Sequence, residues 1–75
     1  MVNLTPAQEE VLFAFAENNM NATDTSRQIH LHRNTVIYHL SKIHESTGLN
    51  PHKFYDLVQL LKLCNEEKEG QNESN

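Results

Sequence analysis

Apolar residues recur three and four positions apart along much of the chain, which is the spacing of one face of a helix. In residues 6–18 this face includes Val11 and Phe15, with small alanines beside it. Thr5 and Gln8 have the spacing of a capping box, in which each side chain satisfies a backbone N–H at the start of a helix. The pattern therefore predicts a first helix over residues 6–18.

A second, shorter helix is predicted over residues 22–29. Asn21 is a favourable N-cap residue, and Asp24 in the first turn lies near the positive end of the helix dipole. The residues that can face inward are few and mostly small: Ala22, Thr25 or Ser26, and Ile29. So thin a face allows another helix to pack closely against it.

Residues 30–32 interrupt the helical pattern and predict a tight turn, with Leu31 inserted into the core. A longer helix is predicted over residues 33–47, and Gly48 provides its C-cap. Its buried stripe has spacings of four, three and four residues and consists of Val36, Leu40, Ile43 and Thr47.

A last helix is predicted from Pro51, with Asn50 as its N-cap. Its main apolar seam consists of Phe54, Leu57, Val58, Leu61 and Cys64. Leu60 and Leu63 lie off this seam and predict an exposed apolar strip of the kind that marks an interface. Residues 66–75 contain no apolar side chain, and we expect them to form a disordered acidic tail.

These elements predict an all-α, small four-helix domain over residues 1–65 that contains a helix-turn-helix. Seventy-five residues are enough for one compact domain with a modest core. Cys64 is the sole cysteine, which excludes a disulfide within the chain and leaves no four-cysteine zinc site. The sequence has no apolar run long enough to span a bilayer and no signal-peptide pattern, so we expect a cytoplasmic protein.

The net charge of −4 is unevenly distributed along the chain. Residues 27–62 contain five lysines and arginines against two acidic residues, a net charge of +3, and all five histidines. The segments before and after this region are acidic. A polyanionic partner is therefore expected to dock on the middle of the chain, although few cations imply weak, salt-dependent binding by one protomer.

A short helix, a three-residue turn and a longer helix form the arrangement that reads the DNA major groove. With Val36 and Leu40 on the buried side, a step of about 100° per residue points several polar side chains outward. Asn34 can pair with adenine, the Thr35 methyl group can contact thymine, and Arg33 can contact guanine or a phosphate. Tyr38 and Lys42 are predicted to contact the sugar-phosphate backbone, where they orient the helix on DNA rather than read the base sequence.

The run from Leu31 to Leu40, LHRNTVIYHL, with the Thr47-Gly48 ending, closely resembles the C-terminal helix-turn-helix of PucR-type and sugar-diacid-type bacterial transcription regulators. The resemblance implies that His32 to Thr35 opens the recognition helix of a regulator of metabolic genes, and that a large sensory region normally precedes the domain. Family members usually carry basic residues where this chain has Ile37 and His39. The candidate DNA-binding residues are His32, Arg33, Asn34, Thr35, Tyr38, His39 and Lys42.

Other functions have less support in the sequence. The alternative is a helical protein-interaction module that keeps the helix-turn-helix shape but has lost DNA binding. No nucleophile or paired-carboxylate arrangement suggests an enzyme, the histidines do not have zinc-finger spacing, and no cofactor is indicated. Because two-fold operators require two protomers, a homodimer formed through the first or last helix is a further possibility.

Overall fold

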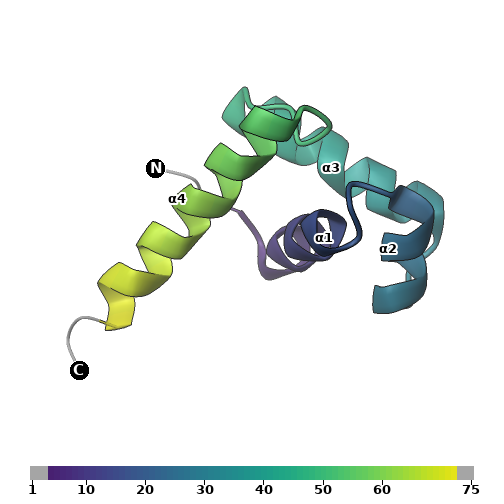
Figure 1. The fold of residues 1–75 in the computed structure, drawn as a ribbon, viewed down its shortest axis with the longest axis horizontal. Coiled ribbons are helices and arrows are strands. Elements are labelled where there is room, and N and C mark those ends of the chain that lie inside the picture. The colour runs from purple at the N-terminus through teal and green to yellow at the C-terminus, as the bar shows by residue number, and fades with distance from the viewer. Residues whose placement is uncertain (1–3, 73–75) are drawn as a thin grey trace.

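The computed structural model describes residues 4–72, with side chains described for residues 4–65. Within this range the chain forms four helices and no strand, which confirms the predicted fold class. The elements are α1 (Pro6–Glu17), α2 (Ala22–Ile29), α3 (Arg33–Thr47) and α4 (Phe54–Asn72). Figure 1 shows α3 and α4 lying on different sides of α1. Helix α2 lies near the end of α3 that is farther from α4.

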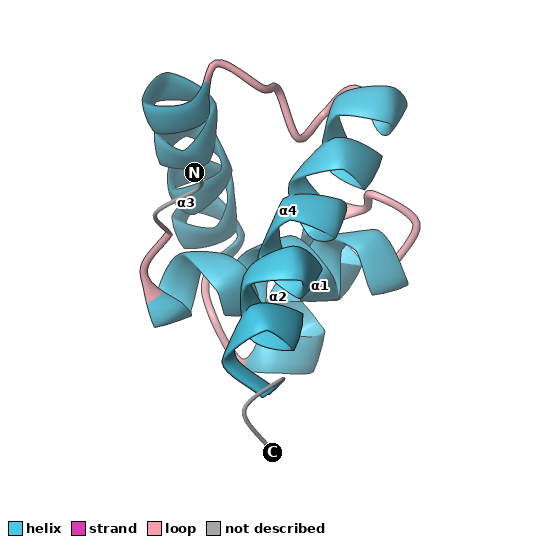
Figure 2. Cartoon of the chain, turned by 90° about the vertical axis from the view of Figure 1, so that its left-hand side faces the viewer, coloured by secondary structure: helices cyan, strands magenta, loops and turns pink. Residues whose placement is uncertain are grey.

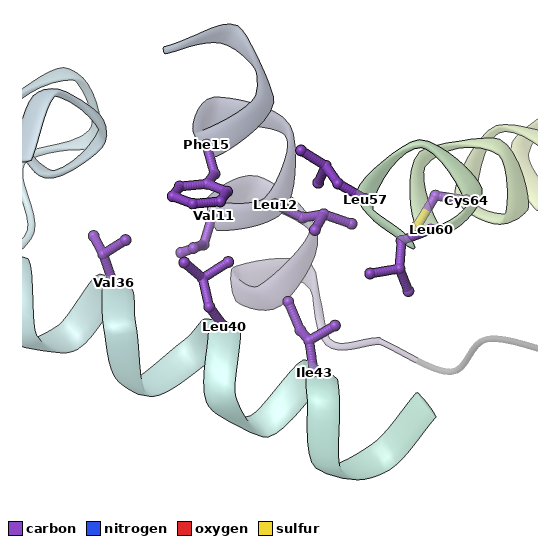
Figure 3. Packing of buried hydrophobic residues seen from close by; sticks show 9 residues of the cluster. All are labelled: Val11, Leu12, Phe15, Val36, Leu40, Ile43, Leu57, Leu60 and Cys64. Carbon is purple, nitrogen blue, oxygen red and sulfur yellow. The ribbon is translucent and has the colours of Figure 1, made fainter. Parts of the chain in front are cut away.

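Helix α1 is the centre of the domain, because it packs against each of the other three helices. Three fully or almost fully buried side chains from each of α1, α3 and α4 form the core (Figure 3). They are Val11, Leu12, Phe15, Val36, Leu40, Ile43, Leu57, Leu60 and Cys64. Figure 1 shows α3 and α4 running in different directions from the loop that joins them, and Figure 2 shows this loop bridging the ends of the two helices.

The helix starts follow the predicted capping chemistry. Gln8 N donates to Thr5 Oγ1 at 3.1 Å and Thr5 N donates to Gln8 Oε1 at 3.0 Å, which completes the capping box of α1. Asp24 N donates to Asn21 Oδ1 at 3.0 Å at the start of α2. Helix α1 ends one residue before the prediction, with Asn18 as its C-cap.

The predicted bounds of α2 and α3 are confirmed, and Gly48 ends α3 at a φ of 78°. The prediction that Leu31 inserts into the core is wrong, since its side chain is 36% exposed. His30 adopts the left-handed conformation, and the backbone N–H groups of His30 and Leu31 both donate to the Ser26 carbonyl. These hydrogen bonds end α2 and direct the chain away from the core before α3 begins.

Helix α4 begins three residues later than predicted. Asn50 Oδ1 accepts from His52 N at 2.9 Å, and Lys53 N donates to the Asn50 carbonyl at 2.9 Å. Asn50 and Pro51 therefore form a separate turn, while α4 starts at Phe54.

The predicted seam of α4 is only partly correct. The side chains that face α1 are Leu57, Leu60 and Cys64, whereas Phe54 is 61% exposed and Val58 is 38% exposed. Leu60, which the sequence placed off the main seam, is fully buried. Among the described residues α4 packs on α1 and on no other helix, so one face of this part of α4 is covered.

The backbone of residues 66–72 continues α4 within the segment for which a disordered acidic tail was predicted. Glutamate, lysine and glutamine have high helix propensity, so a helix already nucleated by packing can propagate into this segment. Residues 73–75 of the predicted tail lie outside the described residues.

Candidate nucleic-acid interface

The short helix α2 is packed closely against both α1 and α3. Its two buried polar residues do not leave unsatisfied groups, because both hydroxyls donate to backbone carbonyls in the preceding turn. Thr25 Oγ1 donates to the Asn21 carbonyl and Ser26 Oγ donates to the Thr23 carbonyl, each at 2.7 Å. Small, internally satisfied side chains thus let α2 hold the start of α3 in a fixed position.

His32 is the N-cap of α3. Its Nδ1 atom accepts from Asn34 N at 3.0 Å, and its carbonyl accepts from Thr35 N and Val36 N at 2.9 and 3.1 Å. The predicted DNA-binding residue therefore has a structural contact within its own turn. Because Nδ1 acts as the acceptor, the neutral ring carries its proton on Nε2, which is the nitrogen left for another partner.

Two polar side chains project from the first turn of α3. Arg33 and Asn34 are exposed, and within the described part of the chain neither side chain forms a hydrogen bond or an ion pair. Thr35 is partly buried at the margin of the same turn. A guanidinium and a carboxamide are thus presented together at a helix N-terminus, as contact with base edges requires.

A second group of candidates lies one to two turns further along α3. Tyr38 is 57% exposed, and Lys42 Nζ lies 5.6 Å from the centroid of its ring. The same Nζ atom lies 3.4 Å from Glu45 Oε1. His39 is partly buried, with its ring centroid 5.8 Å from that of Tyr38.

Glu45 is the residue whose role the sequence analysis missed. Its ion pair with Lys42 was not predicted, although the spacing of three residues is a signal for such a pair. The pair is exposed, with 46% of the Lys42 side chain and 68% of the Glu45 side chain accessible. Water screens a pair of this kind, so it can exchange for a phosphate contact.

All seven predicted site residues lie on or next to one helix, in two adjacent groups. The first turn brings together His32, Arg33, Asn34 and Thr35, and the second group consists of Tyr38, His39 and Lys42. The opposite face of α3 consists of Val36, Leu40 and Ile43, which are buried in the core (Figure 3). Among the described residues, no group of three potential ligands is arranged to hold a metal ion.

The three-residue turn between α2 and α3, the packing of both helices on α1 and the outward polar face of α3 define a helix-turn-helix domain. The chain belongs to the family described as the PucR C-terminal helix-turn-helix domain, which matches residues 9–63. Membership of this family implies a DNA-binding module of a regulator.

The chain is also similar to the uncharacterized protein YxkF of Bacillus subtilis (strain 168), with 35% identity over 50 residues. The similarity covers 67% of this chain but 17% of YxkF, so the chain spans a small part of that relative's length. No solved structure matched the chain. None of the helices in the described range is long and apolar enough to cross a membrane.

Proposed function

We propose that this domain binds DNA sequence-specifically, with α3 in the major groove, as part of a transcriptional regulator. The observation that carries the proposal is the exposed pair Arg33 and Asn34 at the start of a helix whose opposite face is anchored in the core. Such side chains can reach base edges without rearrangement of the fold.

The two groups of residues on α3 have different proposed roles. Arg33, Asn34 and Thr35 read base edges, while Tyr38 and Lys42 contact the sugar-phosphate backbone and set the orientation of the helix. His32 and His39 flank these groups as further phosphate contacts. We propose that two copies bind a two-fold operator, since one protomer offers few cations.

The comparison with YxkF supports a role in a larger protein. Because the matched region is a small fraction of that relative, we propose that this domain works together with a sensory region in regulators of this type. The cytoplasm, where DNA is accessible, is its proposed location.

The test is selection of binding sites from random duplexes, followed by fluorescence anisotropy with the selected site and with variants of each base pair. We expect Asn34→Ala to reduce discrimination at one base pair by about 1–3 kcal/mol, because a bidentate contact is lost. The matched control is Ser46→Ala, an exposed position on α3 roughly 18 Å further along the helix, which should leave discrimination unchanged.

An absence of any enriched sequence would contradict the proposal. In that case the protein-interaction module becomes the better explanation, and one observation favours it: Phe54 and Tyr55 are large apolar side chains that are 61% and 84% exposed. Unchanged discrimination by Asn34→Ala, with DNA binding retained, would instead show that another surface reads the bases.

A further inference from the structure

The open face of α4 carries a second, mostly apolar seam, of which Leu61 also packs against the edge of the core. Phe54, Val58, Leu61 and Asn65 follow one another at spacings of four, three and four residues, which is the spacing of a coiled-coil seam. This open seam lies about 100° around α4 from the seam that faces α1. Phe54 and Val58 are exposed and Leu61 is partly buried, so the open seam presents apolar surface to solvent.

Two hollows flank the open seam. One, of about 310 Å³, is formed with the end of α1 and the loop after it, and is lined by Ala16, Asn19, Met20, Phe54, Leu57, Val58 and Leu61. The other, of about 320 Å³, is lined by Tyr55, Val58, Gln59, Lys62 and Leu63. The protruding side chains of the open seam and the two hollows thus lie on one patch, as a self-complementary two-fold interface requires.

We propose that the open seam of α4 binds the same seam of a second copy of this chain, with the two α4 helices antiparallel. The inference adds a dimer surface to the proposed function and rests on that function only for the use of the dimer on DNA.

The charges along α4 favour the antiparallel orientation. Tyr55 and Lys62 lie seven residues apart on the same side of the open seam, so a two-fold axis near residues 59 and 60 places each Lys62 beside the partner's aromatic ring. A parallel pairing would instead place Lys62 beside the partner's Leu57, an apolar side chain that gives the ammonium group no partner. The antiparallel pairing therefore suits Lys62 better, because it places an aromatic ring beside the ammonium group.

The first experiment is sedimentation equilibrium of the 75-residue chain, without DNA, over the micromolar to millimolar range. We expect a reversible monomer–dimer equilibrium. Val58→Glu should weaken it by about tenfold or more, because a carboxylate would be buried in the interface without a partner. The matched control is Ala7→Glu, at an exposed position in the first turn of α1, which should dimerise as the original chain does.

Circular dichroism of Val58→Glu should show unchanged helix content, since Val58 is exposed in the monomer. Tyr55→Ala, at a position that is 84% exposed, provides a second variant and should weaken the dimer by losing the contact with Lys62 of the other copy. A chain that stays monomeric throughout the range, or a dimer unaffected by both substitutions, would overturn the proposal and leave the open seam to a different partner.

The orientation is tested by oxidation of a mixture of Phe54→Cys and Asn65→Cys chains. The antiparallel pairing predicts disulfides between the two kinds of chain, whereas the thiols of two Phe54→Cys chains would lie roughly 16 Å apart along the axis. Efficient linkage of one Phe54→Cys chain to another through position 54 would exclude the antiparallel arrangement. Asn34→Ala should dimerise normally, so failure of DNA reading and failure of dimerisation can be told apart.

Discussion

Helices α3 and α4 are the two longest in the domain, and each contributes three buried side chains to the core around α1. Their outward faces differ. That of α3 presents Arg33, Asn34 and Lys42, whereas that of α4 presents Phe54 and Val58. The core requires only one face of each helix, so the chemistry of the other face is available to select a partner.

The contrast underlies the two proposals, one surface for DNA and one for a second copy of the chain. Cations and a carboxamide beside a helix N-terminus suit a polyanion with readable base edges. An exposed apolar seam suits another protein surface, because water contacts are replaced by apolar packing there. In this domain the two surfaces lie on different helices, so each can be altered without the other.

The largest expected effect separates the buried face of α3 from the open seam of α4. Leu40→Ala should lower the free energy of unfolding by about 2–5 kcal/mol, because Leu40 is fully buried and its truncation leaves a cavity. That is a large share of the about 4–11 kcal/mol typical of a chain of this length. Urea denaturation followed by circular dichroism gives the value.

The control for this prediction is Val58→Ala on α4, which should cost less than about 1 kcal/mol, since Val58 is 38% exposed. Both measurements are made at protein concentrations low enough for the monomer to predominate. Equal losses for the two substitutions would show that the open seam of α4 is in fact part of the stabilising core.

The success of the sequence analysis for α2 and α3 has a local cause. Their ends are set by groups that act within one turn, such as the Asn21 side chain and the left-handed Gly48. The outward orientation of Asn34, Tyr38 and Lys42 follows from helix geometry once Leu40 is assigned to the core. The candidate site could therefore be placed from the sequence, although its contacts with DNA stay predictions.

The errors in α4 have a tertiary cause. Its apolar residues are so numerous that several seams satisfy helical spacing, and only packing against α1 selects Leu57, Leu60 and Cys64. The ion pair of Lys42 with Glu45 was missed for a different reason, because side-chain rotamers decide whether such neighbours meet. Periodicity alone carries neither kind of information.

A smaller effect compares Lys42 on α3 with a lysine outside α3. Lys42→Ala should weaken binding to all DNA sequences alike and make the slope of log affinity against log salt shallower by about 0.9, because one phosphate contact is lost. Lys53→Ala, an exposed lysine in the turn before α4, should leave that slope unchanged. Anisotropy titrations across a salt series give both slopes, at DNA and protein concentrations where a dimer defect can be recognised by sedimentation.

Similar changes in slope for Lys42→Ala and Lys53→Ala would show that the turn before α4 also contacts the DNA backbone. No change for Lys42→Ala would mean that its ammonium group keeps its ion pair with Glu45 in the complex. The second outcome leads directly to the smallest effect, which concerns Glu45.

Glu45→Gln should strengthen DNA binding about two- to fivefold, within the range of about 0.2–1 kcal/mol for an exposed ion pair. The substitution removes a negative charge from the outward face of α3 and releases Lys42, whose Nζ lies 3.4 Å from Glu45 Oε1. Its matched control is Glu10→Gln, which removes the same charge from an exposed position on α1. If the affinity for DNA rises equally in both variants, net charge is responsible. A rise confined to Glu45→Gln assigns the effect to α3, because the two proteins carry identical total charge.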